Sequence, residues 1–384
     1  MDSAKQNLLG MSEPELTAFA EGIGIERYRG GQIFGWLYTR GADTFRSMTD
    51  LGKELRERLE MSACIEGITP VMQQVSPRDG TTKFLFSLSD NLNIETVLIP
   101  PSSAFMGREA AMEDEQRRLT LCVSTQVGCP LDCIFCATGT MGFSRNLTSG
   151  EIIDQIRQVR RLTERKITNI VFMGMGEPLL NYENLMRATE IITGGLGIAA
   201  RRITVSTAGW IEGIKKMAEE KRRVKLAISL HSAVEETRAS LMPVTRHFSL
   251  EGLSLALDAY YRRTKQRITY EFIFFDGIND SDREVAQLIK FARRVPCKIN
   301  VIPFHSIAFA GLSGLAASLR PSPYTEEIVT RLRAAHLTVM VRSSAGEDIA
   351  AACGQLAVVS RRGGRDLRRP GGTVRHEAQD FNPL

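Results

Sequence analysis

No run of about 18 consecutive apolar residues occurs in the sequence, although a membrane-spanning helix requires one of that length. The N-terminus, MDSAKQNLLGMSEPEL, also lacks the basic start and the apolar segment of a secretory signal. These absences disfavour a membrane protein and a secreted one, so a cytoplasmic location is the default expectation. With 384 residues, the chain is long enough for two or three domains and a sizeable core.

A disulfide scaffold is disfavoured as well. The cysteines are odd in number and irregularly spaced in a chain of globular size, which indicates thiol chemistry in a reducing compartment. There are seven of them: Cys64, Cys122, Cys129, Cys133, Cys136, Cys297 and Cys353.

The formal net charge of +5 is only mildly basic, and by itself it indicates no particular partner. Charge is nevertheless concentrated in residues 360–372, SRRGGRDLRRPGG, which hold five arginines against one aspartate. Such a stretch is either a solvated, disordered tail or a basic arm that binds RNA phosphates.

The sequence divides into four predicted parts. Residues 1–65 contain short helical patterns such as EPELTAFAEG and RYRGGQIFGWLY, and we interpret them as an accessory domain. Residues 66–118 contain TTKFLFSLSDNLNIETVLIPP, which predicts a β-hairpin with an Asp-Asn turn, followed by a polar loop. Residues 119–358 form the main domain, and residues 359–384 form the basic tail.

In the main domain, apolar strand candidates alternate with amphipathic helices. The strand candidates are LTLCVST, TNIVFMG, RITVSTAG, VKLAISLH, ITYEFIFF, CKINVIPF and LTVMVRS, and the helical stretches include SGEIIDQIRQVRRL, LEGLSLALDAYYRR and SDREVAQLIKFARR. Six or more βα units predict an α/β fold with a parallel sheet and right-handed crossovers, either open or closed into a barrel. In both cases the chemistry is expected at the carboxyl ends of the strands.

Three cysteines follow the first of these strands in the loop GCPLDCIFCATG. The spacing C-x3-C-x2-C supplies three thiolates, whereas a closed zinc site needs four ligands. An iron-sulfur cubane held by Cys129, Cys133 and Cys136 keeps one iron open for a small molecule. The alternatives are a zinc site completed from elsewhere, for instance by Cys122, and three thiols that bind no metal.

This loop resembles that of the radical S-adenosylmethionine enzymes. The resemblance implies a [4Fe-4S] cluster whose open iron binds S-adenosyl-L-methionine, and an electron donor of the flavodoxin or ferredoxin type. It also implies a partial (β/α) TIM-like barrel. One electron from the cluster splits the sulfonium to a 5′-deoxyadenosyl radical, while the protein supplies orientation and the exclusion of water.

Glycines and a carboxylate follow the second strand, in VFMGMGEPLLN. Gly174 and Gly176 would let a ligand approach the backbone closely, and Glu177 can accept a hydrogen bond from an ammonium group. A tight turn at the end of a strand explains the two glycines equally well.

Four more polar residues, Ser206, Ser229, His231 and Asn300, lie at the ends of later strands. Their hydroxyl and amide groups can bond ribose or carboxylate oxygens of a cofactor. The alternative is a structural role, as strand-terminal caps, a satisfied core histidine, or an amide bonded to its own turn.

Several motifs, in order from about residue 12 to 358, are similar to the RlmN/Cfr family of adenosine methyltransferases. They are RGGQIFGWLY, IETVLIP, LCVSTQVGCPLDCIFCATG, MGMGEPLLN, STAG, SLH, FDGIND and DIAAACGQL. The RlmN branch methylates C2 of an adenosine in 23S ribosomal RNA and, next to the anticodon, in tRNA. The resemblance implies the same reaction and both RNA substrates for this chain, in a monomeric enzyme.

The resemblance also implies roles for individual residues. Cys353 accepts a methyl group from one S-adenosylmethionine, and a second one yields the radical that converts the S-methyl group into a carbon radical, which adds to C2. Glu95 accepts the C2 proton. Cys122 attacks the sulfur of Cys353 and releases the product, leaving a transient disulfide. The implied contacts to S-adenosylmethionine are Gly176, Glu177, Ser206, Ser229, Leu230, His231 and Asn300.

Two alternatives stay open. A Cfr-type enzyme methylates C8 of the same adenosine, although the proline of MGEPL and the complete N-terminal domain favour C2. A zinc-stabilised RNA-binding protein without catalysis would use the cysteines structurally and the arginines for phosphates. The sequence departs from the family in the length of residues 101–118, in the missing Asn-Pro after Phe304, and after about residue 360. Cys64 and Cys297 have no role in the family pattern.

Overall fold

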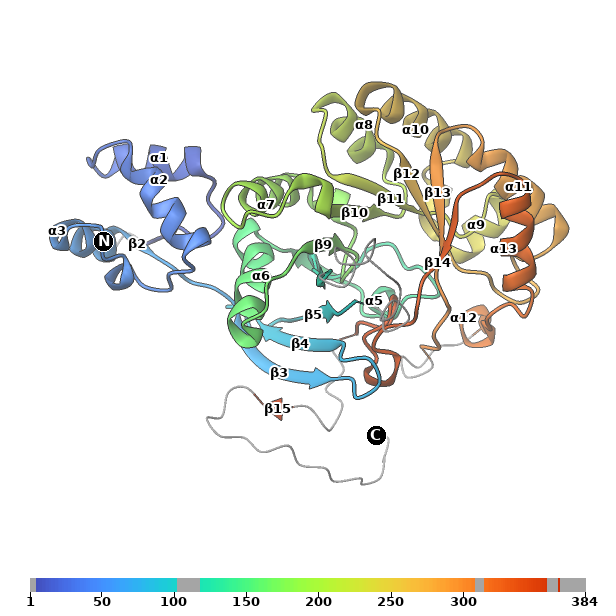
Figure 1. Cartoon of the computed structure of the whole chain (residues 1–384), viewed down its shortest axis with the longest axis horizontal. Helices are drawn as coiled ribbons and strands as arrows, with labels where there is room; N and C mark the ends of the chain where they lie inside the picture. The colour runs from blue at the N-terminus through green and yellow to red at the C-terminus, as the bar shows by residue number, and fades with distance from the viewer. Residues whose placement is uncertain (1–4, 102–117, 308–313, 358–364, 367–384) are drawn as a thin grey trace, which may run out of the picture.

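The computed structural model describes residues 5–101, 118–307, 314–357 and 365–366 (Figure 1). The long loop predicted before residue 118 and most of the basic tail lie outside these residues. Within the described part, eleven strands form one sheet in the order β14-β13-β12-β11-β10-β9-β6-β5-β4-β3-β15. The first and last strands of this order do not pair with each other, so the sheet is a partial barrel.

The N-terminal part consists of short helices beside the sheet (Figure 1). Its elements are β1 (Gln6–Asn7), α1 (Glu13–Gly22), α2 (Arg29–Phe34), the π-helix η1 (Gly35–Thr39), the 3-10 helix η2 (Phe45–Ser47), α3 (Lys53–Ser62) and β2 (Ala63–Cys64). A capping box between Ser12 and Glu15 starts α1, which coincides with the predicted EPELTAFAEG helix. Leu16 and Leu37 are fully buried and form part of the core of this layer.

Two close contacts join the N-terminal helices to the main domain. Gly10 packs against the start of α6 so tightly that a Cβ atom on it would lie 2.2 Å from the Gly150 nitrogen. The Ser149 hydroxyl donates to the Gly10 carbonyl at 2.8 Å, and the Thr39 hydroxyl donates to the Gly195 carbonyl at 3.0 Å. The accessory helices therefore have a defined position on the outer layer of the barrel.

Three antiparallel strands extend one side of the sheet: β3 (Thr69–Val75), β4 (Thr82–Ser87) and β5 (Asn93–Ile99). The predicted hairpin is confirmed as β4 and β5, and Asn91 in its turn has a φ of 65°, which asparagine tolerates well. β3 was not predicted. β5 pairs antiparallel with the first barrel strand, so the hairpin and the barrel form a continuous sheet.

All seven predicted strands of the main domain are confirmed, and they pair parallel in sequence order. They are β6 (Thr120–Cys122), β9 (Asn169–Phe172), β10 (Ile203–Thr207), β11 (Lys225–Ser229), β12 (Ile268–Phe272), β13 (Cys297–Val301) and β14 (Val339–Val341). Each βα connection returns to the neighbouring position, as right-handed crossovers do. All of their carboxyl ends therefore lie at one rim.

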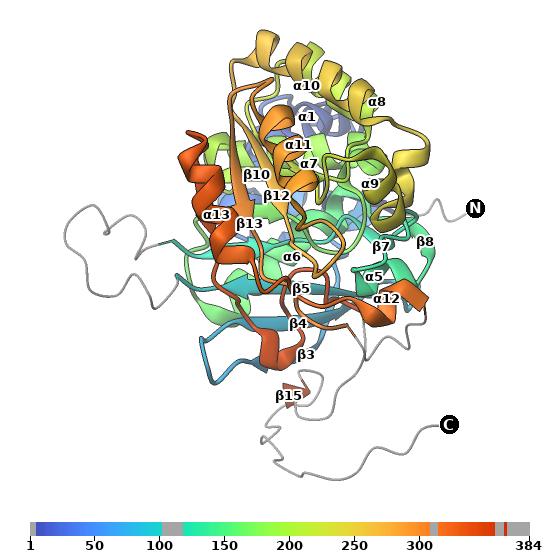
Figure 2. The same ribbon diagram turned by 90° about the vertical axis from the view of Figure 1, so that its right-hand side faces the viewer.

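Helices cover the outer face of these strands (Figures 1 and 2). They are α6 (Ser149–Thr163), α7 (Tyr182–Gly194), α8 (Ile211–Glu219), α9 (Glu235–Leu241), α10 (Leu250–Thr264), α11 (Asp282–Ala292) and α13 (Thr325–Ala334). Short elements complete the fold: β7 (Gln126–Gly128), α5 (Ala137–Thr140), β8 (Phe143–Asn146), α12 (Gly314–Ser318), β15 (Arg365–Asp366), and the 3-10 helices η4 (Pro178–Asn181), η5 (Ala200–Arg202), η6 (Pro243–Arg246) and η8 (Glu347–Ile349).

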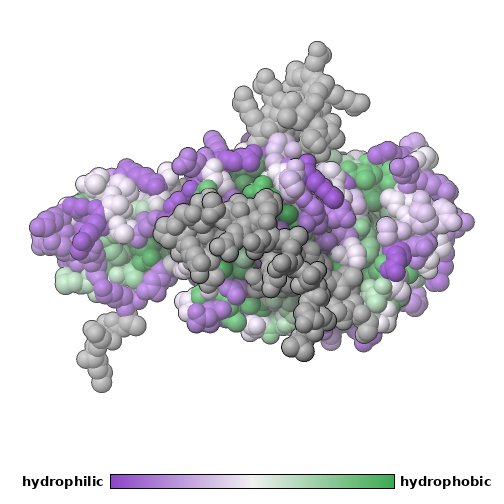
Figure 3. Space-filling model, turned by 90° about the horizontal axis from the view of Figure 1, so that it is seen from below, coloured by the Kyte–Doolittle hydropathy of each residue, from purple (hydrophilic) through white to green (hydrophobic). Residues whose placement is uncertain are grey.

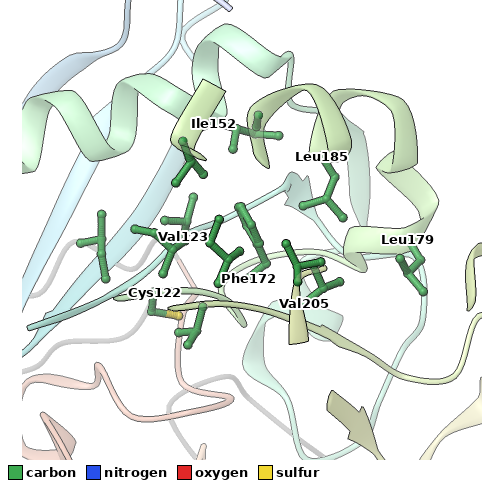
Figure 4. Packing of buried hydrophobic residues seen from close by; sticks show 14 of the residues in the cluster. Cys122, Val123, Ile152, Phe172, Leu179, Leu185 and Val205 are labelled. Atoms are coloured by element: carbon green, nitrogen blue, oxygen red, sulfur yellow. The ribbon is translucent and has the colours of Figure 1, made fainter. Parts of the chain in front are cut away.

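The hydrophobic core lies between the strands and these helices. Figure 4 shows Val123, Phe172 and Val205 together with Ile152 of α6 and Leu185 of α7, and Cys122 at the edge of the cluster. Because side chains alternate along a strand, the residues between these core positions face the concave side of the sheet. The sheet thus separates an apolar outer layer from an inner face that carries polar groups.

No helix in the described ranges is both long and apolar enough to cross a lipid bilayer.

Viewed from below, the N-terminal helices are mostly hydrophilic, and hydrophobic residues reach the surface nearer the middle of the molecule (Figure 3).

Candidate active site

Strand register brings five of the predicted site residues, together with Glu271, to the concave face of the sheet. Cys122 pairs with Val97 on one side and Val171 on the other, and Ser229 pairs with Glu271, which in turn pairs with Asn300. Side-chain alternation then places these residues on one face: Glu95, Cys122, Ser206, Ser229, Glu271 and Asn300. The residues of the predicted chemistry therefore share one surface.

The three cysteines of the C-x3-C-x2-C motif lie in the loop between β7 and α5, and all are partly buried. The Cys129 amide donates to the Gly142 carbonyl at 2.9 Å, and the Cys136 amide donates to the Cys133 carbonyl at 3.1 Å. A third bond, from the Ile134 amide to the Leu241 carbonyl at 3.1 Å, ties the loop to the end of α9. Backbone hydrogen bonds therefore fix the loop before any cofactor binds.

These thiols are close enough to influence one another. Burial raises the pKa of Cys129 to about 12, and the neighbouring Cys136 contributes to the rise. Burial raises the pKa of Cys133 well above its usual value, and Cys136 and Cys129 add to this effect. Three thiolates here would repel one another unless a cation accompanied them, so the donor set suits a positively charged metal group.

The donor set of this loop is three thiols. Among the described residues, no three or more histidine, cysteine, aspartate or glutamate side chains are arranged to hold a single metal ion. Cysteine thiolates are the ligands of iron-sulfur clusters, so the chemistry of this donor set fits a [4Fe-4S] cluster.

The glycines after β9 serve the packing of the loop itself. A Cβ atom on Gly174 would lie 2.8 Å from the Ser124 nitrogen, and one on Gly176 would lie 2.5 Å from the Gln126 side chain. Gly176 also has a φ of 101°, which favours glycine strongly. The backbone turn therefore explains Gly176, and close packing against Ser124 explains Gly174.

Glu177 follows these glycines and is buried. Its carboxylate accepts hydrogen bonds from the Ala208 amide at 2.8 Å and from the Leu179 amide at 3.0 Å. Burial raises the pKa of Glu177 to about 7, although these backbone bonds oppose the rise. Glu177 thus joins the ends of β9 and β10 and lies close enough to Cys129 to raise the pKa of that thiol.

The segment after β11 is folded tightly. Leu230 is completely buried in the core, so it can reach a ligand through its backbone alone. His231 is 3% exposed, and its Nδ1 accepts from the Ile273 amide at 3.1 Å. Burial lowers the pKa of His231 to about 3, so the ring is neutral at pH 7. Its ring meets Phe135 of the cysteine loop edge-on, with centroids 4.6 Å apart.

Arg238 was missed by the sequence analysis, although it supports this whole region. It is 1% exposed and donates to the carbonyls of Ala208 at 2.6 Å, Leu230 at 3.1 Å and Ser229 at 3.2 Å. Burial lowers the pKa of Arg238 to about 10, and the charge of nearby Cys133 opposes this shift. One guanidinium therefore joins the carboxyl ends of β10 and β11 beneath the cysteine loop.

Replacing Arg238 by methionine should lower the free energy of unfolding by about 3 kcal/mol, because several buried carbonyls lose a charged donor. The midpoint of thermal unfolding measures this. Arg263→Met is the control, because its guanidinium is exposed and pairs with Glu219 only at 3.9 Å. Equal midpoints for the two variants would contradict the structural role of Arg238.

The side-chain amide of Asn300 is hydrogen-bonded to the carboxylate of Glu271 and not to its own turn. Its Nδ2 donates to Glu271 Oε1 at 3.0 Å, and Arg342 lies 3.8 Å from Glu271 Oε2. Burial raises the pKa of Glu271, and Arg342 and Asn300 oppose the rise. Sequence reasoning missed both Glu271 and Arg342.

Cys353 lies in a loop that is bonded directly to the cysteine loop. The Ala137 amide donates to the Gly354 carbonyl at 2.7 Å, and the Thr138 hydroxyl donates to the Leu356 carbonyl at 2.6 Å. Cys353 itself is accessible to solvent. Residues more than 200 positions apart are thereby held side by side, and Cys136 is close enough to Cys353 to raise its pKa.

Charged groups from several elements surround Cys353. Loss of hydration raises the pKa of this thiol, and Glu271 and Cys136 raise it further, whereas the guanidinium of Arg342 lowers it. Cys122 is buried, and burial raises its pKa to about 12, with a further contribution from Cys353. Both thiols also act on the pKa of Arg342, which they raise. All seven cysteines are free thiols, so the predicted disulfide is not present in this structure.

Glu95 is 2% exposed, and both of its carboxylate oxygens have partners. Its Oε2 accepts from the Ala357 amide at 3.0 Å, and its Oε1 lies 3.1 Å from the ammonium group of Lys83. The carboxylate of Glu95 therefore has a charged partner, Lys83, which sequence reasoning also missed.

Comparison with known proteins extends over nearly the whole chain. Residues 6–65 match the ribosomal RNA large subunit methyltransferase N-terminal domain, and residues 123–289 match the radical SAM superfamily. The dual-specificity RNA methyltransferase RlmN of Geobacter sulfurreducens is 41% identical over 368 residues, which cover 95% of this chain and 94% of that protein. The enzyme of the same name from Halorhodospira halophila is 40% identical over 358 residues, covering 92% and 94%.

A solved structure agrees with these relatives. The crystal structure of a radical SAM methyltransferase from Sphaerobacter thermophilus superposes with a TM-score of 0.79 at 39% sequence identity, and covers 91% of this chain and 99% of that one. The predicted α/β fold of the radical SAM type is confirmed. The chain belongs to the RlmN family of radical S-adenosylmethionine RNA methyltransferases.

Proposed function

We propose that this enzyme methylates C2 of a specific adenosine in 23S ribosomal RNA and in tRNA, through an S-methylcysteine at Cys353 and with two S-adenosylmethionine molecules per turnover. The observation that carries the proposal is the joining of two loops. Hydrogen bonds from Ala137 and Thr138 to the Cys353 loop hold the methyl acceptor beside the cysteine motif, on the face that also carries Cys122 and Glu95.

The cofactors fit the residues that surround this junction. Cys129, Cys133 and Cys136 would hold a [4Fe-4S] cluster, and the proposed contacts to S-adenosylmethionine are Gly176, Glu177, Ser206, Ser229, Leu230, His231 and Asn300. When bound, these cofactors supply the methyl group and the radical that removes a hydrogen atom from it.

The chain's own thiols then carry the methyl group and release it. The thiolate of Cys353 attacks the methyl carbon of the first S-adenosylmethionine and releases S-adenosylhomocysteine, and the carbon so transferred later forms a bond to C2 of the base. The thiolate of Cys122 then attacks the sulfur of Cys353 and forms a sulfur-sulfur bond, while the carbon leaves with the electron pair of the broken bond and takes up a proton to become the methyl group of the product. The influence of Cys353 on the pKa of Cys122, and of both thiols on the pKa of Arg342, supports this exchange.

Glu95 accepts the proton that leaves C2, since its carboxylate is bonded to the Cys353 loop at Ala357. The base must leave its stack to reach these groups, so we expect an adenosine splayed from an RNA loop, with the N-terminal helices and the basic tail binding phosphates. A flavodoxin or ferredoxin type of donor would provide electrons to a monomeric, cytoplasmic enzyme.

Mass spectrometry of RNA modified by the purified enzyme tests the proposal directly. We expect 2-methyladenosine at one position in 23S ribosomal RNA and at one in tRNA. Finding 8-methyladenosine would indicate the Cfr-type reaction, and finding no methylated adenosine with fully loaded enzyme would refute the proposed function.

Removal of the cluster gives a second prediction. Protein purified without oxygen should be brown and contain about four irons per chain, and Cys133→Ala should lose the colour and most of the iron. Iron analysis and the visible absorption spectrum measure this, and Cys297→Ala serves as the control because Cys297 lies in β13 and donates to Ala292. A colourless, zinc-loaded wild-type protein would contradict the assignment.

A further inference from the structure

A buried ion pair connects the two strands of the hairpin next to the candidate active site. Lys83 of β4 is 8% exposed, and its ammonium group lies 3.1 Å from Oε1 of Glu95, which is 2% exposed. Taking two charges out of water costs several kcal/mol for each ion, and apolar residues would stabilise a hairpin at least as well. The pair therefore calls for a reason other than the stability of the hairpin.

Both members of this pair hold the segment that carries Cys353. Lys83 Nζ donates to the carbonyl of Ala350 at 3.3 Å, and Glu95 Oε2 accepts from the amide of Ala357 at 3.0 Å. Ala350 precedes Cys353 and Ala357 follows it, so the ion pair is hydrogen-bonded to the segment on both sides of Cys353. Ala350 also has a φ of 50°, an unfavourable backbone conformation for alanine that surrounding contacts must maintain.

We propose that Lys83 is a positioning residue, which fixes the carboxylate of Glu95 relative to the Cys353 segment so that the base meets the C2 proton of the bound adenosine. This inference rests on the proposed function, because it assumes that Glu95 is the proton acceptor. In that step the C2–H bond breaks, its electron pair stays on the RNA adduct, and the proton goes to a carboxylate oxygen of Glu95. Lys83 donates hydrogen bonds throughout and exchanges no proton.

The location of Lys83 predicts which step depends on it. The Cys353 segment has further attachments that do not involve Lys83, such as Ser76 to Asp348 at 2.8 Å and the Gly346 amide to Asp79 at 2.9 Å. The segment should therefore stay in place without Lys83, and Cys353 should still receive its methyl group. The later removal of the C2 proton should become slow, so RNA should accumulate as a covalent adduct with the enzyme.

The experiment compares Lys83→Met with wild type in the fully loaded enzyme. Turnover should fall about tenfold or more, while methylation of Cys353, measured by peptide mass spectrometry, should stay within about twofold of wild type. A covalent enzyme-RNA species should appear on denaturing gels, and Lys83→Arg should restore most of the turnover. Lys216→Met is the control, because Lys216 pairs with Glu183 on the outer helices.

Glu95→Gln separates the failure of this inference from failure of the proposed function. If Glu95→Gln turns over normally and forms no adduct, the assignment of the proton acceptor fails, and the inference fails with it. If Glu95→Gln accumulates adduct but Lys83→Met does not, only the positioning role of Lys83 is overturned.

A double variant covers the case in which Lys83→Met folds poorly because it leaves a lone buried charge. Lys83→Met combined with Glu95→Gln contains no unpaired charge, and it should behave like Glu95→Gln alone, since both changes act on the same step. A double variant that also loses methylation of Cys353 would overturn the proposal, because Lys83 would then act on the segment as a whole.

Discussion

Replacing Cys353 by alanine should abolish methylation of RNA, to below about one thousandth of the wild-type rate, because no other group can carry the methyl group between the cofactor and the base. The fold and the cluster should survive. The contacts that hold the segment to the cysteine loop use the backbone carbonyls of Gly354 and Leu356, and the side chain of Cys353 takes no part in them.

Methyl transfer from labelled S-adenosylmethionine, together with iron content, measures both parts of this prediction. Cys64→Ala is the matched control, because Cys64 lies in β2 of the N-terminal part and has no place in the proposed chemistry. Normal methylation by Cys353→Ala would show that the methyl group reaches the base without a protein carrier.

Replacing Cys122 by alanine should leave the first steps intact, in contrast to Cys353→Ala. The RNA should react with the enzyme and then stay covalently attached to it. Without the second thiol, the bond between Cys353 and the methylene carbon has no nucleophile to break it, so most of the enzyme should become covalently linked to RNA within one turnover. Denaturing gel electrophoresis detects the linked species. Cys297→Ala, another buried strand cysteine, should release its product normally.

The release step should also depend on pH in wild-type enzyme. Burial raises the pKa of Cys122 to about 12, so at neutral pH nearly all of this thiol is protonated and unreactive. The thiolate fraction then rises about tenfold for each pH unit, and release should become faster with rising pH wherever it limits turnover. Free methylated RNA formed at the normal rate by Cys122→Ala would refute the releasing role.

The strand pattern was predictable because it depends on local alternation and on turn residues. All seven barrel strands and both strands of the hairpin coincide with apolar stretches of the sequence. β3 escaped prediction because TPVMQQV is only partly apolar. The pairing of Cys122 with Cys353 is implied only by the family resemblance, because no local pattern joins positions so far apart.

The supporting residues could not be predicted from local patterns at all. Arg238 looks like one more charge on an amphipathic helix, yet it is buried under three strand-end carbonyls. Lys83 looks like a solvated hairpin residue, yet it is paired with Glu95 inside the sheet. Both placements follow from tertiary contacts, in which a buried charge is tolerated because several partners surround it.

A pulse-chase measurement tests directly whether the methyl group passes through Cys353. Enzyme is first loaded with a deuterium-labelled methyl group in the absence of RNA, and then receives RNA with unlabelled S-adenosylmethionine. Mass spectrometry of the Cys353 peptide and of the modified adenosine follows the label. We expect the label to leave Cys353 and to appear at C2 of adenosine in the first turnover. The new methyl group should lack one deuterium, because the radical removes one deuterium atom from the methyl group on Cys353. A first product that carries only unlabelled methyl, with the label still on Cys353, would contradict transfer through Cys353.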